Sequence, residues 1–212
     1  MLPPGDPGRQ TASVSVWRPL HPSFMIDMKP DSEPQTPPCG CSVGDPSTAN
    51  DLPKEKQTTL GLYLTAREAY EKWQADPATV AILDVRTPEE YLFVGHPPMA
   101  WLVPLAGQSY EWDPAKGQFP MKPLPDFVAR VKQLAKPDDT ILVTCRSGGR
   151  SAMAVNALAQ AGFTRVHNIT DGFEGDGNGD SESTPRGGWK NSGCPWTKKL
   201  TPERMILPQA VL

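Results

Sequence analysis

Two short runs dominated by apolar residues, Ala81–Val85 and Thr140–Thr144, place the strongest constraint on the fold of this chain. Neither run shows the strict alternation of polar and apolar residues that is typical of a strand with one face in water. Nearly continuous apolar runs of this length are expected in strands that are buried on both faces. Helix signals follow each run, so we predict an α/β fold with three layers, in which helices cover both faces of a central, mostly parallel sheet.

Two threonines mark predicted helix starts. Thr65 and Glu68 have the Ser/Thr-x-x-Glu spacing of a capping box, and Thr87 and Glu90 repeat it, with Pro88 at the first helical position. The first of these helices is predicted to run through about Asp76. The remaining predicted elements are strands at 62–64, 99–105 and 165–169, helices at 125–135 and 150–161, and loops at 106–123 and 176–193.

Proline content divides the chain. Of the 25 prolines in 212 residues, 11 fall within residues 1–57, which are also rich in Ser, Thr and Asp and show no periodicity. Such a segment buries too little apolar surface to offset the entropy lost on ordering its backbone. We therefore predict a disordered Pro-rich tail at 1–57, a folded domain at 58–200 and a short C-terminal tail at 201–212.

Charge and composition exclude several classes of protein. With 21 basic and 24 acidic residues the net charge is −3, which argues against a nucleic-acid-binding surface. No apolar stretch approaches the length of a membrane span, and four cysteines in a chain of this length do not make a disulfide scaffold. We expect a cytoplasmic protein that binds neither nucleic acid nor membrane, or a periplasmic one if the true start lies upstream.

The loop after the second apolar run carries the candidate chemistry. It begins at Cys145 and leads into the helix predicted from Arg150. In open α/β sheets, ligands bind beyond the carboxyl ends of the strands, where this loop lies. Gly148 and Gly149 let the backbone curl so that its N–H groups point toward one spot, and the helix N-terminus adds partial positive charge. Arg146 and Arg150 add permanent charge, so the loop is a predicted anion site with a cysteine at its mouth.

Cys145 is a candidate nucleophile because cations and helix N-termini stabilise a thiolate. Its spacing to the following arginine bears on the reaction. Protein tyrosine phosphatases have Cys-x5-Arg-Ser/Thr, whereas Arg150 follows Cys145 after four residues, and Ser151 stands where the phosphatase arginine would fall. The shorter ring suits a smaller group bonded to the sulfur. Phosphatase chemistry is therefore disfavoured, although it stays open.

Taken together, four segments in order resemble the rhodanese superfamily of sulfurtransferases over residues 58–197. The Cys145 loop resembles the active-site loop of that family. Pro97, Pro98 and Met99 replace the Ile, Pro and Gly of the commoner form. The other three segments are Asp84–Tyr91, which resembles the signature DVRxxxEY, Gly95–Leu105, which resembles GHIPGA followed by IPL, and 171–196, which resembles the closing segment of the family.

The resemblance implies a ping-pong sulfurtransferase. The Cys145 thiolate would take the sulfane sulfur of thiosulfate or a similar small anionic donor, and sulfite would leave. A thiophilic acceptor, such as cyanide, a thiol or a protein cysteine, would then take the sulfur from the Cys145 persulfide. The residues expected to bind the donor are Arg146, Ser147, Gly148, Gly149, Arg150 and Ser151, while Asp84 and Arg86 are expected to brace the loop by ion pairing.

Two other functions stay open: a phosphatase or arsenate reductase on the same fold, and a non-catalytic module whose tail binds a partner. We predict no cofactor and no metal site. Cys39 and Cys41 have no further Cys or His at zinc spacing, and residues 176–187 lack the Gly and Glu of a calcium loop.

Several other residues are expected to have structural rather than catalytic roles. We expect His96 to be a structural hydrogen-bonding group and Cys194 to be an incidental small apolar residue, although Cys194 could also receive sulfur from Cys145. His21 and His167 have no partner at catalytic spacing. Four aromatic residues could cover part of the site or pack in the core, namely Trp101, Tyr110, Trp112 and Phe119.

Overall fold

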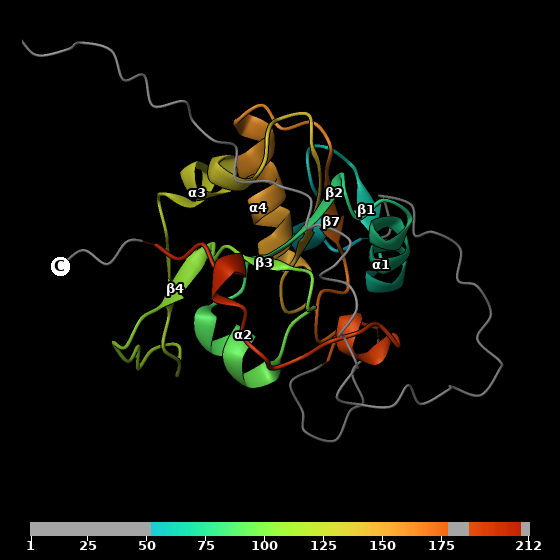
Figure 1. The fold of residues 1–212 in the computed structure, drawn as a ribbon. Helices are drawn as coiled ribbons and strands as arrows, with labels where there is room; N and C mark the ends of the chain where they lie inside the picture. Colours follow the sequence, from blue (N-terminus) through green and yellow to red (C-terminus); the bar gives the residue numbers. More distant parts are fainter. Residues whose placement is uncertain (1–51, 178–186, 209–212) are drawn as a thin grey trace, which may run out of the picture.

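A five-stranded parallel sheet forms the centre of the protein (Figure 1). The computed structural model describes residues 52–177 and 187–208. Every pairing within the sheet is parallel, which confirms the predicted fold class. In spatial order the strands are β1 (Tyr63–Leu64), β7 (Val166–Ile169), β6 (Thr140–Thr144), β2 (Val80–Asp84) and β3 (Trp101–Leu102).

Helices cover both faces of the sheet. Figure 1 shows α1 (Ala66–Ala75) on one side and α3 (Phe127–Leu134) and α4 (Gly149–Gln160) on the other. The sheet divides the core into two clusters, because successive side chains of a strand point to opposite faces. Along β6 and its continuation, Val143 and Cys145 pack with α3 and α4, whereas Leu142 packs on the side of α1.

The predicted capping boxes are present. At the start of α1, the Glu68 N–H donates to Thr65 Oγ1 at 3.3 Å, and the Thr65 N–H donates to Glu68 Oε2 at 2.7 Å. The same reciprocal pair joins Thr87 and Glu90 at the start of α2 (Pro88–Val94). These local signals therefore fix where two helices leave the sheet, and one of them is next to the candidate site.

The region from 99 to 123 differs from the prediction. The strand expected at 99–105 is limited to β3, and the segment expected to be a loop contains a small antiparallel hairpin. Its strands are β4 (Ala106–Gln108) and β5 (Met121–Pro123). Both strands have three residues and are at most half-buried, so they leave no continuous apolar run or strict alternation in the sequence.

The chain packs on the domain beyond both predicted boundaries. Lys54–Lys56 form a 3-10 helix, and Lys56 is buried, whereas the predicted tail includes it. At the other end, Met205 forms a parallel bridge with Leu102, and the Ile206 N–H donates to the Leu102 carbonyl at 2.9 Å. The segment around the 3-10 helix Pro202–Arg204 thus covers the edge of β3, where an unpaired strand would otherwise be exposed.

Some predicted features lie outside the described residues, namely most of the Pro-rich segment with Cys39 and Cys41, residues 178–186, and the last four residues. The predicted loop at 176–193 does contain a short 3-10 helix, Trp189–Asn191, whose tryptophan is fully buried. In the described part of the chain, no helix has the length and apolar character that a membrane crossing requires.

Candidate active site

Cys145 lies where β6 ends, in the loop that leads into α4. Its thiol is unpaired in the described structure and the residue is only 1% exposed. The Gly148 N–H donates to Cys145 Sγ at 3.1 Å, and the Ser151 hydroxyl lies 3.4 Å from the same sulfur. Two donors from the start of the helix therefore converge on one sulfur atom, an arrangement that favours negative charge there.

Glycines allow the loop to lie close against the segment after β7. Gly148 has φ of +100°, and a Cβ on it would lie 2.2 Å from the Thr170 carbonyl oxygen. Gly172 has φ of +62°, and a Cβ there would lie 2.5 Å from the Arg146 carbonyl oxygen. No side chain fits at either position, so both glycines are needed for this close approach.

Backbone hydrogen bonds fasten the same two segments together. The Phe173 N–H donates to the Cys145 carbonyl at 2.7 Å, and the Glu174 N–H donates to the Arg146 carbonyl at 2.9 Å. The stretch Asp171–Gly175, which begins the segment 171–196 noted in the sequence, therefore holds the cysteine loop in place through its backbone.

Arg150 does not stand free beside the sulfur. Its Nη1 lies 2.7 Å from Glu90 Oε2 and its Nη2 lies 2.6 Å from Glu90 Oε1. Burial by itself would raise the pKa of Glu90, but the ion pair with Arg150 outweighs burial and lowers that pKa. Arg146, in contrast, is exposed, and Ser147 is half-buried. The two arginines expected to bind the donor thus have different surroundings.

Asp84 and Arg86 form a fully buried ion pair at the end of β2. Arg86 Nη2 lies 2.6 Å from Asp84 Oδ2 and also donates to the Gly95 carbonyl at 2.7 Å. Burial alone would lower the pKa of Arg86, but Asp84 outweighs burial and raises it. The guanidinium lies 4.2 Å from the ring centre of Phe173. The two residues thus pair with each other, and Arg86 reaches the cysteine loop through Phe173, whose N–H bonds to the Cys145 carbonyl.

Residues 65–177 match the family model described as "Rhodanese-like domain". The chain belongs to the rhodanese-like family. Its match to thiosulfate sulfurtransferase 16 of Arabidopsis thaliana has 41% identity over 91 residues, 43% of this chain and 68% of the relative. An uncharacterized protein of Rickettsia prowazekii is 32% identical over 121 residues, which are 54% of this chain and 80% of that relative.

A solved structure shares the fold of this chain. The crystal structure of Rv0390 from M. tuberculosis has a TM-score of 0.51 and 28% identity, and it covers 64% of this chain and 96% of its own. The family match ends at residue 177, so the described segment from 187 to 208, which packs on the rhodanese-like domain, lies beyond it.

Sequence reasoning missed Asn168, which is fully buried on β7 of the rhodanese-like domain. Its Nδ2 donates to the Gly148 carbonyl at 3.2 Å and to the Lys56 carbonyl at 3.0 Å. The available signal was an amide side chain between His167 and Ile169 in a short strand of the predicted sheet. A buried amide in such a strand must find partners, and here one partner is the cysteine loop.

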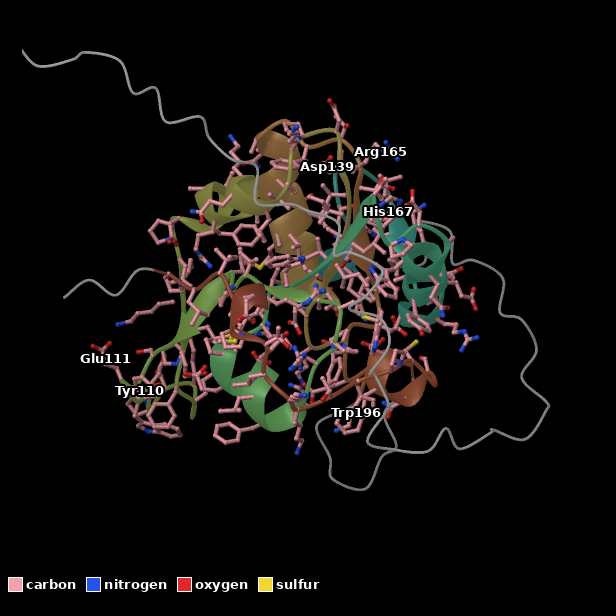
Figure 2. The ribbon with its side chains drawn as sticks, viewed as in Figure 1. Tyr110, Glu111, Asp139, Arg165, His167 and Trp196 are labelled. Atoms are coloured by element: carbon pink, nitrogen blue, oxygen red, sulfur yellow. The ribbon has the colours of Figure 1, made fainter. Side chains whose placement is uncertain are left out.

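The aromatic residues of the rhodanese-like domain divide into two groups. Trp101 is partly buried against the core, whereas Tyr110, Trp112 and Phe119 are exposed on the hairpin. The Tyr110 hydroxyl donates to Glu89 Oε1 at 3.2 Å, and Figure 2 shows Tyr110 at the outer end of the hairpin. Met121 Sδ lies 3.6 Å from Arg150 Nη1, so the hairpin borders the site.

Two other residues have structural surroundings. His96 is buried and stacks on Tyr91 with ring centres 3.6 Å apart, and burial lowers the pKa of its imidazole. Cys194 packs on the α1 side of the sheet, opposite Cys145, and burial raises the pKa of its thiol to about 12. Within the described residues, no hydrogen bond joins either side chain to the cysteine loop. Within the described ranges, no group of three or more His, Cys, Asp or Glu residues could hold a metal ion.

Proposed function

We propose that this rhodanese-like protein is a sulfurtransferase that carries sulfur as a persulfide on Cys145. The single observation that carries the proposal is the convergence of the Gly148 N–H and the Ser151 hydroxyl on Cys145 Sγ, at 3.1 and 3.4 Å. Donors fixed in advance around a sulfur stabilise the negative charge that it bears before and after sulfur transfer.

In the first half-reaction, the Cys145 thiolate attacks the outer sulfur of thiosulfate or a similar donor. A new S–S bond forms, the bond between the two donor sulfurs breaks, and sulfite leaves with the electron pair. The product is a terminal persulfide anion on Cys145, so total charge is conserved and no proton needs to move. Neither described group that hydrogen-bonds to Sγ is a general base, and this step needs none.

In the second half-reaction, an acceptor nucleophile attacks the terminal sulfur and regenerates the Cys145 thiolate. Cyanide is a convenient acceptor in an assay, and a small thiol or a protein cysteine is the cellular class that we propose. A compartment that keeps thiols reduced, such as the cytoplasm, suits this cycle because an oxidised cysteine cannot accept sulfur.

The two arginines divide the work of binding an anionic donor. Arg146 is exposed at the loop and attracts the donor from solution. Arg150 lies in the first turn of α4, where it shares its charge with Glu90. The donor therefore competes with Glu90 for Arg150 during the first half-reaction, and sulfite release restores the ion pair.

Steady-state transfer from thiosulfate to cyanide tests the proposal. Cys145→Ser should abolish transfer without changing the melting temperature by more than a few degrees. Cys194→Ser is the matched control, because its thiol lies on the other face of the sheet, and it should retain transfer. Transfer by the Cys145→Ser protein would contradict the proposal. Hydrolysis of an aryl phosphate that depends on Cys145, with no sulfur transfer, would favour the phosphatase alternative.

A further inference from the structure

The buried side chain of Asn168 links three parts of the chain that are distant in sequence. Asn168 is on β7, the Lys56 carbonyl belongs to the segment that precedes the sheet, and the Gly148 carbonyl belongs to the cysteine loop. Both donated bonds come from the one Nδ2 atom, at 3.0 and 3.2 Å. The two N–H groups of that amide are thereby both used, and neither is left for another acceptor.

The Ser151 hydroxyl has one proton and two acceptors within reach. Ser151 Oγ lies 3.0 Å from the Gly148 carbonyl oxygen and 3.4 Å from Cys145 Sγ. A hydroxyl can donate to only one of them at a time. If the hydroxyl donates its hydrogen bond to the carbonyl, the Gly148 N–H is the one remaining donor of these two to the sulfur.

The Gly148 carbonyl has enough donors without the hydroxyl. Its oxygen has two lone pairs, and it accepts from the Ala152 N–H at 3.2 Å as well as from Asn168 Nδ2. A buried carbonyl without a hydrogen-bond donor destabilises the fold. Because these two donors already satisfy the Gly148 carbonyl, little stability is lost when the Ser151 hydroxyl donates to the sulfur instead. Asn168 is the donor that comes from outside the helix.

We propose that Asn168 is a positioning residue for the sulfur chemistry: by donating to the Gly148 carbonyl, it frees the proton of Ser151 to bond to the sulfur of Cys145. The inference rests on the proposed function, because it concerns the same sulfur. It also gives the segment around Lys56 a role in holding the site, since the same amide fastens both.

A double-mutant cycle on the reactivity of Cys145 tests the proposal. The readout is the rate of alkylation of reduced protein by iodoacetamide near pH 7, read at Cys145 by peptide mass spectrometry. A hydrogen bond to a charged group contributes enough that losing one should slow alkylation by about tenfold. We expect this loss in Ser151→Ala and in Asn168→Ala, but less than about a twofold further loss when Asn168→Ala is added to Ser151→Ala.

Equal losses from Asn168→Ala in both backgrounds would overturn the proposal, since Asn168 would then act without Ser151. Asn156→Ala is the matched control, because that amide lies on α4 and contacts Thr59 instead of the loop, and it should alkylate at the wild-type rate. If Asn168→Ala does not fold, Asn168→Leu keeps the volume without the donors. The assay needs no sulfur donor, so failure of persulfide formation would be seen separately and would count against the proposed function alone.

Discussion

Arg150 and Glu90 form a bidentate ion pair between the first turn of α4 and the first turn of α2. The two N···O distances are 2.6 and 2.7 Å, although the residues are 60 positions apart in the sequence. Both side chains are about one-fifth exposed. Glu90 is also the residue that completes the capping box of α2. The Glu90 carboxylate therefore links the N-terminus of α2 to Arg150 of the candidate active site.

Arg150→Ala should impair use of the donor more than use of the acceptor. In the proposed reaction the guanidinium would bind the dianionic donor and the leaving sulfite, whereas a neutral thiol acceptor has no charge for it to bind. We expect kcat/KM for thiosulfate to fall by about tenfold or more, the effect of one charge-assisted contact, with a smaller change for the thiol acceptor. Kinetics with both substrates varied would measure the two losses, and equal losses would contradict this role.

Glu90→Gln should make stability less sensitive to acid. The pKa of Glu90 is lowered in the folded protein, so its ion pair stabilises the fold above the unfolded pKa, and that contribution is lost as pH falls through the folded pKa. The melting temperature of wild type should exceed that of Glu90→Gln at about pH 6, and the difference should shrink by about pH 3. A difference that is constant over this range would show that the pair adds no pH-dependent stability.

Asp84→Asn should destabilise the whole domain. The variant leaves the Arg86 guanidinium fully buried without its counter-charge, and breaking a buried pair in this way costs about 3–5 kcal/mol. Urea unfolding would measure the loss in the free energy of unfolding. Because Arg86 reaches the cysteine loop through Phe173, the folded fraction should also lose sulfur transfer. A loss below about 1 kcal/mol would mean that Arg86 finds another partner or water.

Gly148→Ala should abolish transfer, and Gly162→Ala should not. Both glycines have φ near +90 to +100°, so an alanine at either is strained by about 1–3 kcal/mol. Only the Cβ at Gly148 would meet backbone, at 2.2 Å from the Thr170 carbonyl oxygen, while nothing lies within 4 Å of a Cβ at Gly162. Comparing melting temperatures and transfer rates of the two variants separates backbone strain from displacement of the loop. Full activity of Gly148→Ala would contradict the geometry described for the loop.

Local patterns explain which elements could be predicted from the sequence. The two capping boxes involve residues three apart, and β2 and β6 are five-residue runs that are buried on both faces. The placement of Cys145 follows from the same logic, because the end of a buried strand next to a glycine pair and a helix is a local signal. The predicted bounds of β6 are the observed ones.

Contacts between distant residues explain what could not be predicted. Glu90 was identified as a helix cap, yet its second role as the partner of Arg150 depends on how α2 and α4 are placed by the sheet. Asn168 and Lys56 are 112 residues apart, and a buried lysine in a Pro-rich segment gives no signal of its own. The hairpin strands are too short and too exposed to leave a pattern.

The mass of the intact, reduced protein after incubation with thiosulfate tests the central claim most directly. The account predicts a gain of one sulfur atom in wild type, located at Cys145 by peptide mapping, and its loss when cyanide is added. Cys194→Ser should gain the same mass, and Cys145→Ser should gain none. No gain in wild type with thiosulfate, and again none with polysulfide, would contradict a persulfide on Cys145.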